Sequence, residues 1–205
     1  RDGQAPTVVV ADFDETLVYE NTLLPLFAQV ARKPMFRVVL EALVGGEIFS
    51  LGPHRAIKAQ MYREILNGQT VEQIEQAARE ISKNVRVNVA AMEIVRSNSG
   101  DDTQFVVASA SLEEVVRTIL EEKNITANRV IGTIAVKSGN AYTGELIGGE
   151  CVGRRKAVTV QSVLAQHYTG YRVVALGNLP PDRALLKLAD EAFVVDGDNI
   201  STFGV

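Results

Sequence analysis

The sequence predicts an α/β fold: a Rossmann-like three-layer α/β/α core around a mostly parallel sheet, with an inserted bundle of helices that forms a cap. Two observations carry this prediction. Unbroken runs of apolar and β-branched residues, which are typical of strands buried on both faces, alternate with segments of helical apolar spacing. Residues 20–97 interrupt that alternation with successive helical segments and no convincing strand.

Four segments are predicted to be buried strands, and each ends at a polar residue or a glycine. They cover residues 7–11, 103–108, 171–176 and 192–195, and they end at Asp12, Ser109, Gly177-Asn178 and Asp196. Apolar residues recur with helical spacing over residues 112–120 and 157–164, between these strands. Strands that alternate with helices favour an open sheet whose strands are mostly parallel.

Residues 20–97 are predicted to form a small helical bundle between the first and second strands. Helical apolar spacing covers three segments, which begin near Leu23, Pro34 and His54. A fourth segment opens with Thr70-Val71-Glu72-Gln73, which has the form of a capping box with Thr70 as the N-cap. We therefore predict two units, a core of residues 1–19 and 98–205 and a helical cap of residues 20–97.

Composition and charge exclude several classes of protein. Of the 205 residues, 46% are hydrophobic, which is the apolar content of a globular chain. The net charge of −4 argues against a nucleic-acid partner, because such proteins present a basic surface. No apolar run approaches the roughly 20 residues that span a bilayer, so no membrane partner is expected. The single cysteine, Cys151, and the lack of a signal-peptide core in residues 1–6 predict a cytoplasmic location.

The residues that carry chemistry gather where the predicted strands end, at the edge where open α/β sheets bind ligands. The clearest pattern is Asp12-Phe13-Asp14-Glu15-Thr16-Leu17, directly after the first strand. Two carboxylates separated by one residue can face one crevice in different environments, so that one attacks as a nucleophile while the other exchanges a proton. The alternative for this pattern alone is that Asp12 and Asp14 cap a turn and a helix.

Three further segments add groups that suit a phosphoryl site. Ser109, with backbone N–H groups near Ala110, could hold a phosphoryl oxygen at a helix N-terminus, or simply cap that helix. Lys156 could neutralise charge on a transferring phosphoryl group, or belong to a solvated helix face. Asn178 and Asp182 offer hard oxygen atoms that suit Mg²⁺, or form a turn and a helix cap.

Together, these four segments resemble the phosphatases of the haloacid dehalogenase superfamily. The similarity is greatest to the phosphoserine-phosphatase-like subclass, in which a helical cap follows the first motif. The matching positions are Asp12, Asp14, Thr16, Leu17, Ser109, Lys156, Gly177 and Asp182. Connecting segments are similar as well, namely Val130-Ile131-Gly132-Thr133, Thr143-Gly144 and Cys151-x-Gly153-x-x-Lys156. The resemblance covers nearly the whole chain.

The resemblance implies a Mg²⁺-dependent phosphatase that hydrolyses a small phosphorylated metabolite in two steps. Asp12 would attack phosphorus to form an aspartyl-phosphate, and Asp14 would act as general acid and base, a role worth about 10²–10⁴ in rate. Ser109 and Lys156 would stabilise the phosphoryl oxygens. The implied metal ligands are Asp12, the backbone carbonyl of Asp14, and the fourth motif. Asp14 also favours phosphoryl transfer over dehalogenation, because a departing halide needs no proton.

The fourth motif departs from the family pattern at Asn178, where an aspartate is usual. An amide oxygen can bind Mg²⁺ but adds no charge, so we predict weaker metal affinity, with Asp182 as a compensating ligand. Two alternatives stay open. The residue is an engineered substitution that traps a complex, or the chain is a catalytically weakened domain that binds a phosphorylated ligand. A purely structural or partner-binding domain is disfavoured by the intact Asp12, Asp14 and Lys156.

A second departure concerns the substrate. In the phosphoserine enzymes, a glutamate nine residues past the nucleophile reads the substrate amine, whereas this chain has Asn21 there, beside Glu20. Phosphoserine is therefore not supported. The predicted phosphate- and substrate-binding set is Thr16, Glu20, Asn21, Arg55, Ser109, Ala110 and Lys156, and further cap-side candidates are His54, Lys58 and Arg63. The first motif is also similar to that of phosphatases that act on phosphorylated polymerase tails, but those lack a large helical insert here. The oligomeric state is left open.

Overall fold

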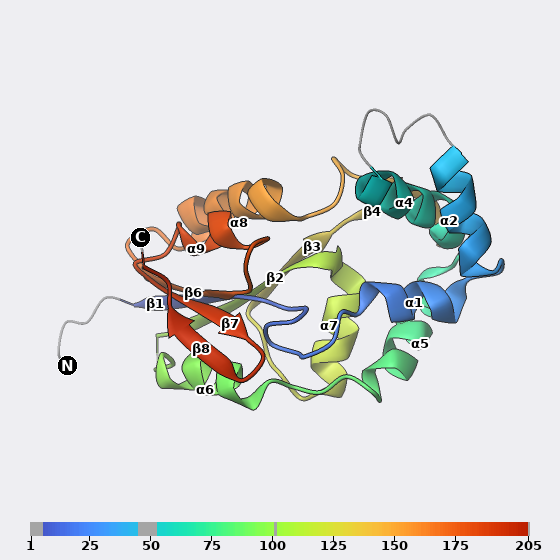
Figure 1. The fold of residues 1–205 in the computed structure, drawn as a ribbon. Helices are drawn as coiled ribbons and strands as arrows, with labels where there is room; N and C mark the ends of the chain where they lie inside the picture. The colour runs from blue at the N-terminus through green and yellow to red at the C-terminus, as the bar shows by residue number, and fades with distance from the viewer. Residues whose placement is uncertain (1–5, 45–52, 101, 205) are drawn as a thin grey trace.

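The computed structural model describes residues 6–44, 53–100 and 102–204 of the chain. A six-stranded sheet occupies one half of the molecule, and helices cover both of its faces (Figure 1). The sheet order is β3-β2-β1-β6-β7-β8. Its strands are β1 (Thr7–Asp12), β2 (Gln104–Leu112), β3 (Arg129–Thr133), β6 (Arg172–Gly177), β7 (Glu191–Asp196) and β8 (Asn199–Thr202). All neighbouring pairs are parallel except β7 and β8, which confirms the predicted mostly parallel α/β core.

The two faces of the sheet carry different hydrophobic clusters because successive side chains of β1 point to opposite sides. Val8 and Val10 pack with α8 (Gly153–His167) and α9 (Arg183–Leu186). Val9 and Ala11 pack on the other face with α6 (Val89–Ser97) and α7 (Glu113–Glu122). The unalternated apolar run of β1 thus corresponds to a strand buried on both faces, as predicted.

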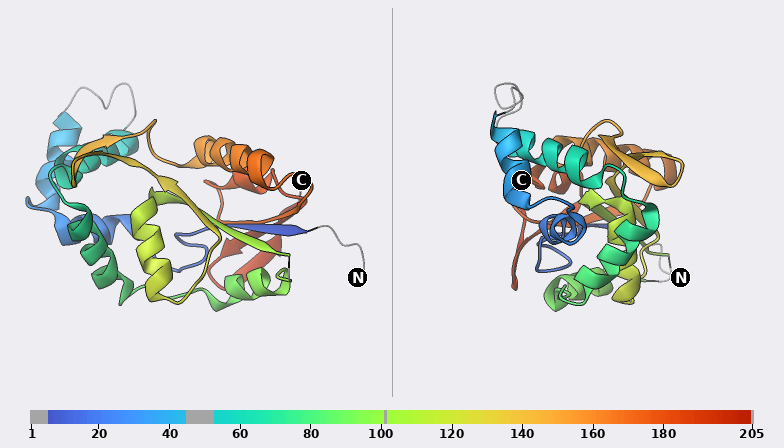
Figure 2. Two further views of the ribbon diagram at one scale, coloured as in Figure 1. Left: turned by 180° about the vertical axis from the view of Figure 1, so that it is seen from behind. Right: turned by 90° about the vertical axis from the view of Figure 1, so that its right-hand side faces the viewer.

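A group of helices lies beyond the carboxyl ends of the strands, at the opposite end of the molecule from the start of β1 (Figure 2). It contains α1 (Leu23–Val30), α2 (Met35–Val44), α4 (Pro53–Met61), a π-helix η1 (Tyr62–Leu66) and α5 (Val71–Ser82). Thr70 caps α5 as predicted, because its hydroxyl accepts from the N–H of Gln73 while the Gln73 side chain accepts from the N–H of Thr70. These helices correspond to the predicted helical cap.

Two segments lie outside the units in which the sequence placed them. Helix α6, expected in the cap, lies against the sheet, where the Asn88 amide donates to the carbonyl of Gly197 between β7 and β8. The hairpin of β4 (Ala135–Ser138) and β5 (Ala141–Leu146), expected in the core, packs on the cap: the N–H of Tyr142 donates to the carbonyl of Gln69, and the N–H of Gly68 donates to the carbonyl of Tyr142. The division at residues 19 and 97 stays a prediction, and we propose that the cap ends before Val87 and includes this hairpin.

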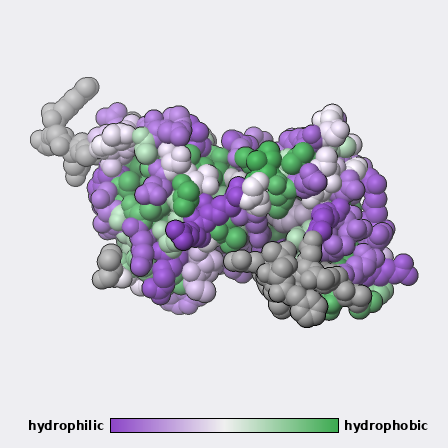
Figure 3. Space-filling view, turned by 90° about the horizontal axis from the view of Figure 1, so that it is seen from above, coloured by the Kyte–Doolittle hydropathy of each residue, from purple (hydrophilic) through white to green (hydrophobic). Residues whose placement is uncertain are grey.

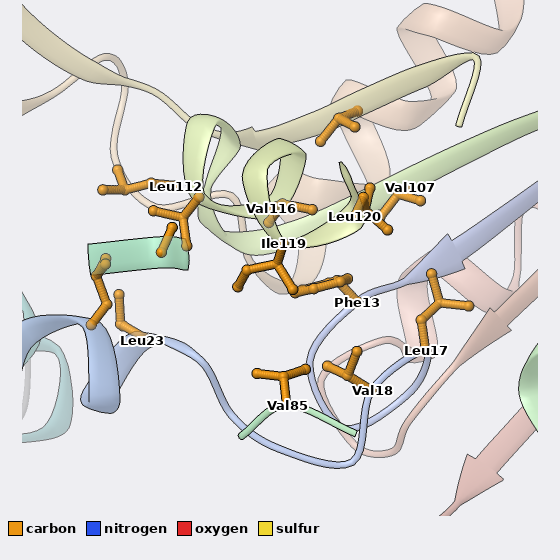
Figure 4. Close-up of a cluster of buried hydrophobic side chains, with 14 of the residues drawn as sticks. Phe13, Leu17, Val18, Leu23, Val85, Val107, Leu112, Val116, Ile119 and Leu120 are labelled. Atoms are coloured by element: carbon orange, nitrogen blue, oxygen red, sulfur yellow. The ribbon is translucent and has the colours of Figure 1, made fainter. Parts of the chain in front are cut away.

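Cap and core share one hydrophobic cluster. Figure 4 shows Phe13, Leu17 and Val18 of the loop after β1 facing Val116, Ile119 and Leu120 of α7, with Leu23 of α1 nearby. Phe13 and Leu17 are fully buried. Because Phe13 lies between Asp12 and Asp14 and Leu17 follows Thr16, burying these apolar residues restricts where the polar side chains of the same loop point.

The surface is mixed in character. Seen from above, hydrophilic and hydrophobic side chains are interspersed over the visible face of the molecule (Figure 3). None of the described helices combines the length and the apolar character needed to span a bilayer.

Candidate active site

Asp12 is held in place by two hydrogen bonds at the carboxyl end of β1. The Lys156 ammonium donates to Asp12 Oδ1 at 2.6 Å, and the Thr16 hydroxyl donates to Asp12 Oδ2 at 2.9 Å. Asp12 is only 4% exposed. Both oxygens therefore keep a fixed orientation before any ligand arrives, which is the property required of a positioned nucleophile.

Lys156 bridges two buried carboxylates from the first turn of α8. Its ammonium lies 2.6 Å from Asp12 and 2.8 Å from Asp182. Burial alone would lower the pKa of Lys156, but the two carboxylates outweigh that effect and raise it. The side chain is therefore a permanent cation at the carboxyl edge of the sheet.

Asp182 is also tied to the loop that follows β6. Its Oδ2 accepts from the backbone N–H of Asn178 at 3.2 Å, while Oδ1 accepts from Lys156. Burial, and after it the nearby Asp12 charge, raise the pKa of Asp182 to about 6. A side chain at Gly177 would place a Cβ 2.7 Å from the Cβ of Asp182, so this contact requires glycine there. We assign Asp182 to positioning Lys156.

Asp14 lies in a network of hydroxyl groups. Its Oδ1 accepts from the N–H and the hydroxyl of Thr22, both at 2.7 Å, and its Oδ2 accepts from Ser111 at 2.7 Å and Ser109 at 3.3 Å. Burial is the largest cause of a raised Asp14 pKa, and the charge of Asp12 adds to it, although the hydroxyl hydrogen bonds oppose it. Two carboxyl groups two residues apart thus have different environments, as an acid and a nucleophile require.

Asn178 and Glu15 lie side by side at the same edge. The Asn178 side-chain amide donates to Glu15 Oε2 at 3.2 Å, which turns the Asn178 carbonyl oxygen away from Glu15. Glu15 has a φ of 59°, in the left-handed region that few non-glycine residues adopt, at the point where the loop turns after Asp14. This contact could not be predicted from the sequence, because the two residues are 163 positions apart.

These residues suit Mg²⁺ by the chemistry of their donor atoms. Asp12, the carbonyl of Asp14 and the Asn178 side chain supply oxygen ligands only, which is the set that hard divalent cations prefer. Within the described part of the chain, no three His, Cys, Asp or Glu side chains are grouped as a metal site. The role of Asp182 as an extra metal ligand stays a prediction; in this structure its two oxygens accept hydrogen bonds from Lys156 and from the backbone N–H of Asn178.

One cavity of about 670 Å³ joins these groups to the cap. Its lining includes eight of the predicted residues, namely Asp12, Asp14, Asn21, Lys58, Ala110, Lys156, Asn178 and Asp182. Residues from the cap complete it, namely Leu23 and Leu24 of α1 and Ile57, Lys58 and Met61 of α4. The structure thus brings the four predicted loops to one cavity that extends between the core and the cap.

Several predicted residues lie elsewhere. Glu20 does not line this cavity, and its carboxylate binds the backbone N–H and the guanidinium of Arg86, so substrate binding by Glu20 stays a prediction. Thr16 and Ser109 are fully buried behind the lining and face Asp12 and Asp14 respectively. Phosphate binding by Ser109 therefore stays a prediction. The side chains of His54 and Arg55 lie outside the described part of the structure.

Sequence reasoning missed the residues that hold Asp14. Thr22 and Ser111 supply its three shortest hydrogen bonds, yet they are 8 and 97 positions away. The alternation in Ala108-Ser109-Ala110-Ser111 is the one sequence pattern that points to this network. Strand β2 continues to Leu112, so both serines lie within it, and residues two apart in a strand share one face. The sequence had instead predicted a strand ending at Ser109.

A family model for haloacid dehalogenase-like hydrolases matches residues 9–187 of the chain. Among solved structures, a protein of unknown function from Bordetella pertussis Tohama I is 17% identical, with a TM-score of 0.72 over 92% of this chain and 89% of that one. A phosphoserine phosphohydrolase-like protein from Francisella tularensis is 16% identical, with a TM-score of 0.62 over 91% and 85%.

A third similar structure is a phospho-aspartyl intermediate analogue of phosphoserine phosphatase, which is 18% identical, with a TM-score of 0.59 over 92% of this chain and 86% of that one. No curated protein matches the chain in sequence. At these identities the likeness establishes the fold that the chain shares with these proteins, while the substrate has to be argued from the site.

Proposed function

Because the chain belongs to the haloacid dehalogenase-like hydrolase family, we propose that it is a phosphatase that hydrolyses a small phosphomonoester through a covalent intermediate on Asp12. The observation that carries the proposal is the Asp12 carboxylate, held by Lys156 and Thr16 at the cavity. Asp14, two residues further on and also lining the cavity, has a raised pKa. Nucleophile and acid thus meet at one site.

In the first step, an Asp12 carboxylate oxygen forms a bond to phosphorus while the bond from phosphorus to the ester oxygen breaks. The departing alkoxide takes the proton of Asp14, which becomes a carboxylate. The raised pKa of Asp14 supports this role, because the protonated form must be present when the ester binds.

In the second step, Asp14 accepts a proton from a water molecule that attacks the phosphorus of the aspartyl-phosphate. The bond from phosphorus to the Asp12 oxygen breaks, inorganic phosphate leaves, and both carboxyl groups return to their starting states. The four hydrogen bonds that reach Asp14 from Thr22, Ser111 and Ser109 keep it in one orientation through both proton transfers.

Charge on the phosphoryl group is balanced mainly by Lys156, whose ammonium faces Asp12. Asp12, the Asp14 carbonyl and the Asn178 amide oxygen are the groups that would hold Mg²⁺. That ion, when bound, supplies additional positive charge for the phosphoryl oxygens. Asp182 keeps Lys156 in position and contributes no step of its own.

The proposal is tested with p-nitrophenyl phosphate, with and without EDTA, for the parent protein and Asp12→Asn. We expect Mg²⁺-dependent release of p-nitrophenol, and a loss of at least about a thousandfold in kcat for Asp12→Asn. The matched control is Asp196→Asn, because Asp196 ends the parallel strand β7 but is exposed and outside the cavity. Hydrolysis that survives in Asp12→Asn would overturn the assignment of the nucleophile.

A second candidate is a domain that binds a phosphorylated ligand with little turnover. The observation that favours it is the amide of Asn178, which brings no charge to the predicted metal site. Beryllium fluoride, which mimics a phosphoryl group on a carboxylate, distinguishes the two candidates. Tight, Asp12-dependent binding of beryllium fluoride without measurable hydrolysis of any ester would select this second function.

A further inference from the structure

The two ends of the cavity differ in chemistry. At the core end lie Asp12, Asp14 and Lys156, the groups that would act on phosphorus. At the cap end, helices α1 and α4 present an apolar wall. This apolar wall consists of Leu23, Leu24, Ile57 and Met61. Because the cavity is continuous, a phosphoester bound at the core end would extend its alcohol group toward this wall.

The polar groups on the cap side already have partners. The Lys58 ammonium forms an ion pair with Glu150 at 2.8 Å, and both side chains are mostly buried. The Asn21 side-chain oxygen accepts from the backbone N–H of Leu23 at 3.2 Å. Glu20, which precedes Asn21 in the chain, binds Arg86 with its carboxylate and does not line the cavity. Glu15 lies on the core side with Asn178 as its partner.

We propose that the substrate is a phosphomonoester whose alcohol carries an apolar chain or ring, which packs on the apolar wall. This inference rests on the proposed function. An ammonium or carboxylate on the alcohol would lose water and find no unpaired charge among the described cap residues that line the cavity, which is unfavourable. An apolar group would gain from burial, and the gain would increase with each methylene group that enters the cavity.

The exposure of Leu24 supports the same assignment. Its side chain is 56% exposed although it lines the cavity, so a large apolar surface faces solvent at the predicted binding site. Single exposed leucines are common on protein surfaces. Leu24 differs because Leu23, Ile57 and Met61 line the same cavity, and together they would cover an apolar group from two helices.

The test uses alkylphosphonates, which keep the phosphate-like head but cannot be hydrolysed. Affinities of ethyl-, butyl- and hexylphosphonate are measured by isothermal titration calorimetry in the presence of Mg²⁺, with O-phosphoserine alongside. Complete burial of a methylene group corresponds to about a fourfold gain in affinity, or about 0.8 kcal/mol. We expect hexylphosphonate to bind at least about tenfold more tightly than ethylphosphonate, and O-phosphoserine to bind no better than the ethyl compound.

Two leucines of nearly equal exposure provide the variant and its control. Leu24→Asn should reduce the ratio of the affinity for hexylphosphonate to that for ethylphosphonate by about threefold or more, because it places an amide on the apolar wall. Leu40→Asn should leave this affinity ratio unchanged, because Leu40, which is 57% exposed on α2, is not among the residues that line the cavity.

Affinity that does not increase with chain length, or O-phosphoserine binding more tightly than hexylphosphonate, would overturn the proposal. An equal decrease of the affinity ratio in Leu24→Asn and Leu40→Asn would also overturn it. Because the alkylphosphonates cannot be hydrolysed, the dependence of their affinity on chain length is separate from the proposed phosphatase activity. Graded binding together with no hydrolysis of any ester would support the apolar wall and reject the phosphatase.

Discussion

The core end and the cap end of the same cavity use ion pairs in opposite ways. At the core end, Lys156 lies between Asp12 and Asp182, and the three side chains are 1% to 6% exposed. At the cap end, Lys58 pairs with Glu150, and these side chains are 27% and 16% exposed. Water can screen the second pair but not the first, so the core group depends on every member being present.

This difference separates reaction from recognition. The core end positions Asp12 and Asp14 with short hydrogen bonds from three segments, the loop after β1, strand β2 and helix α8, before any substrate binds, which fixes the chemistry. The apolar wall makes no directed polar contacts, so its residues can change with little effect on those hydrogen bonds. A change at the core end should therefore lower kcat, whereas a change at the apolar wall should alter which ester is bound.

The largest effect is expected when the core ion group loses its cation. Lys156→Met leaves two buried carboxylates without a partner and removes the positive charge that faces the phosphoryl group. We expect kcat for p-nitrophenyl phosphate to fall by about 10²–10³. The free energy of unfolding should fall by about 3–5 kcal/mol. Steady-state kinetics and urea unfolding followed by circular dichroism measure the two quantities.

Lys58→Met is the matched control, because it removes the cation of the partly exposed pair on the cap side. Its free energy of unfolding should change by at most about 1 kcal/mol. Equal destabilisation of the two variants would contradict the comparison, since it would mean that burial does not distinguish the two ion pairs.

A smaller effect is expected where the metal site lacks a charge. Asn178→Asp adds a carboxylate to the proposed metal site, and a unit charge about 4 Å from a cation contributes up to about 4 kcal/mol at an effective dielectric of about 20, before desolvation offsets much of it. We expect Mg²⁺ to bind about tenfold more tightly, as measured by isothermal titration calorimetry without substrate. No gain in affinity would show that Asn178 is not at the metal site.

Glu15 makes this second experiment sharper. In the parent protein, Glu15 accepts a hydrogen bond from the Asn178 amide, and in Asn178→Asp the same place holds two carboxylates. The double variant with Glu15→Gln removes that repulsion. The single variant Glu15→Gln keeps an oxygen acceptor for Asn178, so its Mg²⁺ affinity should stay close to that of the parent protein.

The local parts of the fold and site could be predicted from sequence. The apolar run of β1, the carboxylates that follow it and the capping box of Thr70 are each defined by neighbouring residues. The structure has strand β1 and the N-cap of α5 where the pattern predicted them. Parallel strands deliver their carboxyl ends to one edge. For that reason, Asp12, Lys156 and Asp182 could be expected to converge although they are far apart in the chain.

The features that the sequence did not reveal depend on tertiary contacts. Nothing near Glu20 signals its pairing with Arg86, which lies 66 residues away. The strands β3 and β8 were missed because each is short and completes the edge of a sheet that other strands define. Helix α6 was assigned to the cap because its apolar spacing does not tell which surface it contacts. The hydrogen bond from Asn88 to Gly197, 109 residues away, attaches it to the core.

The smallest effect compares the N-caps of one cap helix and one core helix. Thr70→Ala removes a hydrogen bond to the N–H of Gln73 at the start of α5, and the free energy of unfolding should fall by about 1 kcal/mol.

Asn88→Ala removes the N-cap of α6 and also leaves the Gly197 carbonyl without its amide donor. Since Asn88 is 1% exposed, that variant should lose about 2–3 kcal/mol in the same urea titration. Neither residue lines the cavity, so kcat should stay within about twofold of the parent value in both variants. Equal losses of stability would mean that the contact with Gly197 adds nothing, and would place α6 with the cap helices after all.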